Sequence, residues 1–159
     1  MKIACIIVAG TLAISIHAAA APDDTVPYPA DYRQWAHVKS TLVGPQNPGF
    51  ATNGGLHHFY ANPKGLEGYR TGTFPDGAVL IDDLVEMKDA ATPGVSDEGT
   101  RRRVAVMVKD SQKFADTGGW GFEIFKGDTQ AASLDTKGRA ACFACHQKQK
   151  SAVFSQLRK

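Results

Sequence analysis

Several short segments of the chain alternate apolar with polar residues and are rich in β-branched and aromatic side chains. They are separated by turn-forming stretches such as Pro75-Asp76-Gly77 and Gly118-Gly119. A period of two residues between such turns predicts antiparallel strands. We expect these strands at residues 56–60, 78–87, 102–109 and 120–125.

Around the strands the spacing of apolar residues becomes helical. A helix is expected from about Asp31 to Leu42, because its apolar residues recur every three or four positions and form one stripe. Asn62 followed by Pro63 is typical of a helix N-cap and first position, which predicts a short helix there. The stripe consists of Tyr32, Trp35, Val38 and Leu42.

Two more helical segments are expected toward the C-terminus: a turn from Asp110 to Ala115, and a helix that begins between Thr136 and Ala140. An antiparallel β-sheet with packed helices is an α+β fold. The length is that of a single domain, and the sequence shows no internal repeat.

The first residues have the organisation of a secretory signal peptide. Lys2 precedes an apolar run from Ile3 to Ile16, and small residues follow up to Ala20. An uncleaved membrane anchor is the alternative, but the run is shorter than the roughly 20 residues that span a bilayer. We expect residues 1–20 to be removed near Ala20, which leaves residues 21–159 as a periplasmic chain without a membrane segment.

Charge changes this picture little. The net charge is +2, and it is nearly balanced once Lys2 is removed, which argues against a nucleic-acid binder. The run Arg101-Arg102-Arg103 follows a turn-rich stretch. We expect it to be a solvated strand entrance rather than an anion site.

The candidate chemistry lies near the C-terminus, in the string Cys142-Phe143-Ala144-Cys145-His146. This string fits the C-x-x-C-H motif of covalent haem c attachment. The two thiols would bond the haem vinyl groups, and His146 would be the proximal ligand of the iron. Such attachment takes place outside the bacterial cytoplasm, so the motif and the export signal support each other.

Three other uses of the two cysteines are weaker alternatives. A thioredoxin-like redox pair is expected at the start of a helix after an early strand. A zinc site needs further ligands, and His57 and His58 would point to opposite faces of a strand. A disulfide closing so short a loop gains little stability and leaves His146 unexplained. We expect His37, His57 and His58 to be surface or edge histidines.

With these elements in place, the chain resembles the cytochrome P-460 family and its relatives, the β-sheet cytochromes c-prime. The resemblance implies a cytochrome P-460-like mono-haem domain over residues 21–159, a homodimer of antiparallel sheets, His146 as proximal ligand and an iron that is open on its distal side. It is carried in order by Tyr32-Arg33-Gln34-Trp35, Tyr60-Ala61-Asn62, Gly72-Thr73-Phe74-Pro75-Asp76-Gly77, Val108-Lys109-Asp110, Phe114-Ala115, Gly118-Gly119-Trp120-Gly121-Phe122, the haem motif and Val153-Phe154-Ser155.

Two positions depart from the founding members of that family, which oxidise hydroxylamine. Asp82 stands where their haem is cross-linked to a lysine, and Lys88 lies six residues further on, out of register. Ala105 stands where they have a distal glutamate that relays protons. The resemblance therefore implies a haem without the extra lysine bond and a distal side without that proton acceptor.

These departures favour a haem protein that binds a small gaseous or nitrogenous ligand. Strand alternation places Ala105 and Met107 on one face, so we expect both to border the haem. A distal pocket without hydrogen-bond donors favours nitric oxide or carbon monoxide over dioxygen. Arg70 is expected to lie on the surface. The expected haem-site residues are Cys142, Cys145, His146, Asp82, Ala105 and Met107.

Two alternatives stay open. One is a hydroxylamine-oxidising enzyme in which Asp82 or Arg70 takes over the missing roles. The other is an electron-transfer cytochrome in which Met87 or Met107 closes the iron as a sixth ligand. A redox partner protein is conceivable in either case, steered by the basic C-terminal residues, which are Lys148, Lys150, Arg158 and Lys159.

Overall fold

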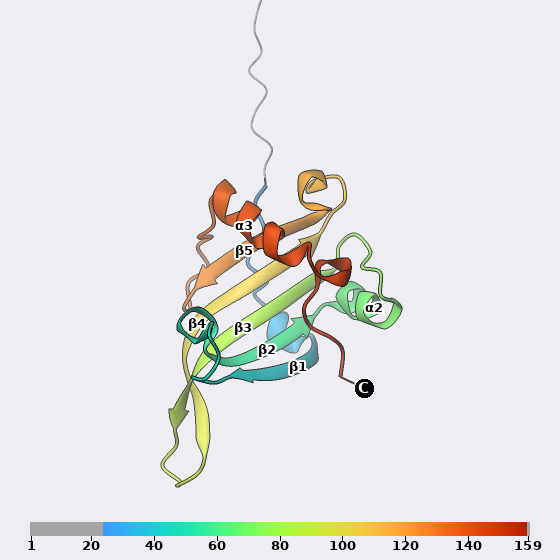
Figure 1. Cartoon of the computed structure of the whole chain (residues 1–159). Helices are drawn as coiled ribbons and strands as arrows, with labels where there is room; N and C mark the ends of the chain where they lie inside the picture. The colour runs from blue at the N-terminus through green and yellow to red at the C-terminus, as the bar shows by residue number, and fades with distance from the viewer. Residues whose placement is uncertain (1–23, 159) are drawn as a thin grey trace, which may run out of the picture.

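The computed structural model describes residues 24–158, and within them one antiparallel sheet has five strands that follow one another in chain order (Figure 1). The strands are β1 (Ala36–Val43), β2 (Gly55–Ala61), β3 (Val79–Asp89), β4 (Ser96–Lys109) and β5 (Trp120–Lys126). The helices are α1 (Phe50–Asn53), α2 (Pro63–Thr71) and α3 (Thr136–His146), and the 3₁₀ turns are η1 (Tyr32–Gln34), η2 (Ala115–Thr117) and η3 (Lys150–Ala152). The α+β fold and the four expected strands are confirmed. The proposed signal peptide, residues 1–20, lies outside the described residues.

The sheet separates two apolar clusters, because paired residues of antiparallel strands point to the same face. Leu80, Met107 and Phe122 are paired across β3, β4 and β5 and lie on the side covered by α3, which we call the α3 face (Figure 1). The opposite face carries Ile81 and Val106, and residues from the N-terminal segment before β1 pack against it. Within the described residues, no helix is long and apolar enough to cross a membrane.

The helix expected from Asp31 to Leu42 is wrong, because residues from Ala36 onward form β1 and pair with β2. The residues of the expected apolar stripe lie in different environments. Tyr32 packs in the cluster on the opposite face, Val38 is buried in the cluster on the α3 face, and Leu42 is 60% exposed. Strand pairing outweighs the weak helical spacing here, since Val38, Thr41 and Val43 are β-branched and suit a strand.

The connection between β2 and β3 is α2, which the sequence predicts correctly. The Asn62 side chain accepts a hydrogen bond from the Gly65 amide, 2.8 Å away, and so caps the first turn. Gly72 ends the helix with a φ of 83°, a left-handed conformation that favours glycine. The helical turn expected from Asp110 to Ala115 begins later, as η2, because Asp110 caps a turn at Gln112 and Lys113 first.

The three arginines of β4 are bonded rather than solvated, so the expectation of a solvated strand entrance is wrong. Arg101 pairs with Asp83 and Asp128. Arg102 donates to the carbonyls of Ala51 and Gly54, and Arg103 donates to the Thr52 carbonyl and the Asn53 side chain. The last two arginines thereby tie the segment containing α1 to the sheet.

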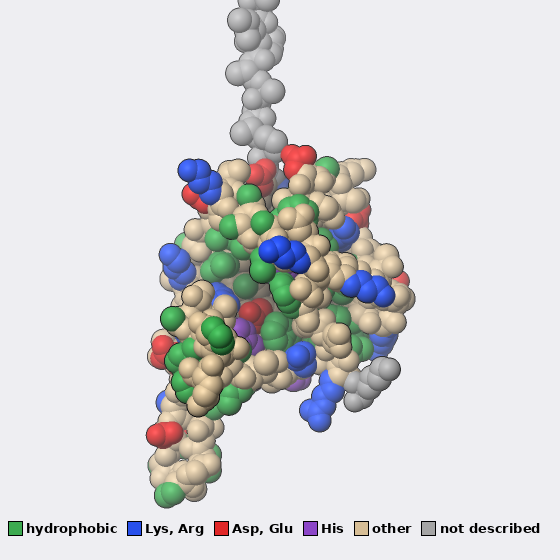
Figure 2. All heavy atoms as spheres, in the orientation of Figure 1, with side chains coloured by type: hydrophobic (Ala, Val, Ile, Leu, Met, Phe, Trp, Pro, Cys, Tyr) green, Lys and Arg blue, Asp and Glu red, His purple; other side chains and the backbone are tan. Residues whose placement is uncertain are grey.

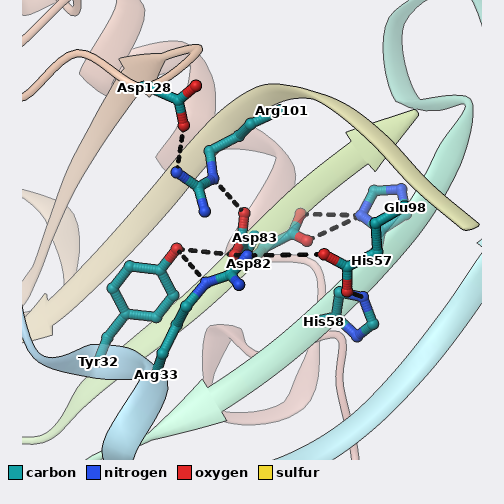
Figure 3. Close-up of polar contacts among 9 residues, drawn as sticks. All are labelled: Tyr32, Arg33, His57, His58, Asp82, Asp83, Glu98, Arg101 and Asp128. Carbon is teal, nitrogen blue, oxygen red and sulfur yellow. Dashed lines mark hydrogen bonds and ion pairs between the residues drawn. The ribbon is translucent and has the colours of Figure 1, made fainter.

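Asp83 is the centre of a buried charge network on the face opposite α3 (Figure 3). Its carboxylate accepts hydrogen bonds from the Tyr32 hydroxyl at 2.7 Å, from Arg33 at 2.8 Å and from Arg101 at 2.9 Å. Burial alone would raise the pKa of Asp83, but these hydrogen bonds outweigh it and lower the pKa below its usual value. The network ties η1 to β3 and β4.

Replacing Asp83→Asn should lower the free energy of unfolding by about 3 kcal/mol, because it removes the charge of a fully buried carboxylate that is bonded to Tyr32, Arg33 and Arg101. The matched control is Asp128→Asn, whose side chain is 79% exposed and whose loss should cost less than about 1 kcal/mol. Urea unfolding measures both. Because the pKa of Asp83 is lowered, its stabilisation is present above the ordinary aspartate pKa and should be lost as the pH falls through the lowered value. Equal losses in the two variants would contradict this role of Asp83.

Candidate haem site

The haem motif lies on α3, which begins at Thr136 as expected. Asp135 caps the helix by accepting a hydrogen bond from the Gly138 amide at 2.7 Å. Cys142, Cys145 and His146 are three and four positions apart on this helix, so they lie on one side of it within about one turn. This is the arrangement that two thioether bonds and a proximal ligand require.

The two thiols are free and differ in environment. Cys142 is half-buried against the apolar cluster of the α3 face, whereas Cys145 is exposed. Burial raises the pKa of the Cys142 thiol. Among the described residues, no three His, Cys, Asp or Glu side chains lie close enough to bind a metal ion together.

The ring of His146 is oriented by the chain that follows it. Its Nδ1 lies 2.8 Å from the carbonyl oxygen of Ala152. A carbonyl only accepts, so Nδ1 must donate, and in the neutral ring Nε2 then carries the lone pair. The ring is packed between Phe122 and Phe154, at centroid distances of 5.2 and 4.9 Å. Metal-binding histidines are typically held in this way, with the second nitrogen donating to a carbonyl.

Glu123 on β5 anchors the start of α3 to the sheet. It is 1% exposed, and its carboxylate accepts hydrogen bonds from the amides of Ser133 and Leu134 and from Arg139 of α3. Burial alone would raise the pKa of Glu123, but these hydrogen bonds outweigh it and lower the pKa. No sequence pattern pointed to Glu123, because its partners are mainly backbone amides ten residues further along the chain.

The α3 face presents a surface toward the haem motif. Asp82 pairs with Phe59 on one side and with Ala105 on the other, so all three lie on this face. Met107 is two residues from Ala105 and packs with the same cluster as Cys142, whereas Val104 and Val106 belong to the opposite cluster. The prediction that Ala105 and Met107 share a face is confirmed.

Figure 2 shows a hollow in the middle of this side of the molecule. Hydrophobic side chains line its walls, and acidic and histidine side chains are visible at its floor (Figure 2). We therefore consider this hollow as the candidate place for a flat, largely apolar group such as a haem.

The α3 face is apolar along only part of its length, which corrects the expectation of a pocket without hydrogen-bond donors. Leu84 of β3 pairs with His57 of β2 and with Arg103 of β4, so these two side chains also lie on the α3 face. Both contact Asp82. His57 is 6% exposed, so its expected place at the surface or edge is wrong. No signal in β2 marks it, because the contact depends on the pairing of β2 with β3.

The other proposed residues lie apart from this surface. His58 points to the opposite face, where it contacts Ser40 and Glu98, and His37 is exposed. Arg70 is exposed at the end of α2, as predicted. Met87 is 38% exposed and lies where β3 pairs with β4 alone, beyond the ends of β2 and β5.

Comparison with known proteins agrees with this site. The family model described as cytochrome P460 matches residues 29–155, which include the sheet, α3 and the whole haem motif. The chain belongs to the cytochrome P460 family. This cytochrome P460 family member is therefore a haem protein. The two thiols and the imidazole on α3 are suited to holding a haem. No curated protein matches the chain.

Replacing Glu123→Gln should lower the free energy of unfolding by about 1.5–3 kcal/mol, because a buried charged acceptor of several hydrogen bonds is lost. Urea unfolding measures this change. The control Glu86→Gln lies on the exposed part of β3 and should change stability by less than about 0.5 kcal/mol. If both variants unfold like the original protein, Glu123 is not the anchor of α3.

Proposed function

We propose that this member of the cytochrome P460 family is an exported c-type mono-haem protein with an open distal side that binds small diatomic ligands such as nitric oxide. Cys142 and Cys145 would hold the haem through thioether bonds, and His146 Nε2 would bind the iron. When bound, the haem supplies an iron position at which a diatomic ligand can coordinate.

One observation supports the proposal that the distal side of the haem is open. Ala105 lies on the α3 face between Asp82 and Ile124, with a methyl group where the family resemblance assigns a proton-relaying glutamate. A methyl group neither coordinates iron nor accepts a proton. In this proposal the distal side above β4 leaves room for a ligand and lacks the glutamate of the hydroxylamine oxidisers.

The packing of Met107 supports the same proposal against an electron-transfer cytochrome. Its side chain packs with the apolar cluster that includes Leu80 and Phe122, as a filler of the sheet surface. Met87, the other candidate sixth ligand, lies outside both clusters on the exposed end of β3.

Hydroxylamine oxidation is the second candidate, and Asp82 favours it. This carboxylate lies beside Ala105 on the α3 face, so it is a polar group near the proposed distal space. Against this second candidate, Asp82 also stands in place of the cross-linking lysine. The haem would therefore lack the lysine bond of the founding enzymes.

The proposal extends to location and assembly. Residues 1–20 would direct export, and the mature chain, residues 21–159, would act in the periplasm, where haem c is attached. A homodimer and a redox partner protein are proposed on the family resemblance, and neither nucleic acid nor membrane is proposed as a partner.

Replacing Cys142→Ala or Cys145→Ala should remove one thioether bond each, and the double variant should lose its haem to acidified organic solvent. The original protein should retain the haem, with an intact mass of the mature chain plus one haem. A haem-bearing peptide that contains Lys64 or Lys88 would contradict the absence of a lysine bond. Haem that resists extraction from the double variant would contradict the proposed attachment.

The ferrous protein should be high-spin and five-coordinate and should bind carbon monoxide or nitric oxide without losing a protein ligand. Met107→Leu conserves volume and apolarity, so it should leave the absorption spectrum nearly unchanged and cost less than about 1.5 kcal/mol in stability. In an electron-transfer cytochrome the same change converts low-spin to high-spin iron. Rapid turnover of hydroxylamine by the original protein would instead support the second candidate.

A further inference from the structure

His57 is a buried histidine whose two ring nitrogens both face acceptors. Its Nδ1 lies 2.8 Å from Asp82 Oδ1 and 3.1 Å from Oδ2, and its Nε2 lies 2.8 Å from the carbonyl oxygen of Asn53 (Figure 3 shows the bonds to Asp82). A carbonyl oxygen and an ionised carboxylate accept only, so both nitrogens donate. Arg103 faces the same carboxylate at 3.8 Å. The geometry therefore describes an imidazolium.

The charged groups around His57 come from three strands. Asp82 of β3 is in contact with it, Arg103 of β4 faces the same carboxylate, and Lys39 of β1 lies beyond the Phe59 ring that stacks on His57. Burial and Arg103 would each lower the pKa of His57. The hydrogen bonds to Asp82 and Asn53, together with the charge of Asp82, outweigh them and raise it.

The two hydrogen bonds of His57 join different parts of the proposed distal site. Asp82 lies beside Ala105 on the α3 face, with 22% of its side chain exposed. Asn53 ends α1, and the carbonyls of this segment are also bonded by Arg102 and Arg103. His57 is thus a link between a carboxylate on the haem-facing surface and the segment between β1 and β2.

We propose that His57 is a positioning residue of the ligand site, which as an imidazolium holds Asp82 against the sheet and ties α1 to it, so that ligand access depends on the His57 proton. This inference rests on the proposed function, since it requires an open haem on the α3 face. When His57 loses a proton, one nitrogen becomes an acceptor facing an acceptor. Either Asp82 or the Asn53 carbonyl is then released, and the surface over Ala105 changes.

The test measures carbon monoxide association with the ferrous protein by flash photolysis, from about pH 5.5 to about pH 9. The original protein should show a step of about fivefold or more, with a midpoint above the ordinary histidine pKa. His57→Gln should abolish the step, because Gln does not titrate, and Asp82→Asn should move or abolish it. The matched control is His58→Gln, which changes the neighbouring histidine on the opposite face and should retain the step.

A second readout does not depend on the haem ligand. Because the pKa of His57 is raised, its stabilisation is fully present below the ordinary histidine pKa and is lost as the pH rises through the raised value. Urea unfolding should therefore show this loss in the original protein and in His58→Gln, but not in His57→Gln.

The outcomes separate the two proposals. A five-coordinate ferrous protein that binds carbon monoxide with no pH step overturns the role of His57 and leaves the proposed function standing. A step that persists in His57→Gln does the same. A six-coordinate ferrous protein that does not bind carbon monoxide overturns both.

Discussion

The site depends on the register between the strands, above all that of β3 with its neighbours. β2 carries two adjacent histidines, and β3 carries two adjacent aspartates. In the observed register, His57 and Asp82 lie on the α3 face, and His58 and Asp83 lie on the other. A shift by one residue would exchange the members of each pair between the faces. The strand register alone therefore decides which histidine and which aspartate face α3 and which face the other side.

The two aspartates illustrate the difference. Asp83 is fully buried and bound by a tyrosine and two arginines, so it serves the stability of the sheet and of η1. Asp82 keeps 22% of its side chain exposed and is bound by His57 and, more distantly, by Arg103. The first carboxylate is enclosed by its partners, whereas the second has an edge left for another group.

The sequence predicts the parts of this protein that depend on local signals. The haem motif, the four strands from β2 to β5 and the Asn62 cap each have a pattern within a few residues. The helix in place of β1 was wrong because its residues become a strand only through pairing with β2. The contact of His57 with Asp82, the bonds of Arg102 and Arg103 and the anchor Glu123 could not be predicted, since each joins residues at least ten positions apart in the chain.

The hydrogen bond from His146 to the Ala152 carbonyl limits which substitutions can change the proximal side of the proposed haem site. The acceptor is a backbone carbonyl, which every amino acid possesses, so no side-chain replacement at Ala152 deletes it. This hydrogen bond can therefore be altered only by moving the main chain. That chain passes through Ser151 and Ala152, which both have positive φ values, of 55° and 59°. If His146 binds the iron as proposed, the hydrogen bond on its second nitrogen depends on the backbone conformation of this short C-terminal turn, where insertions or glycine replacements would act and conservative surface changes would not.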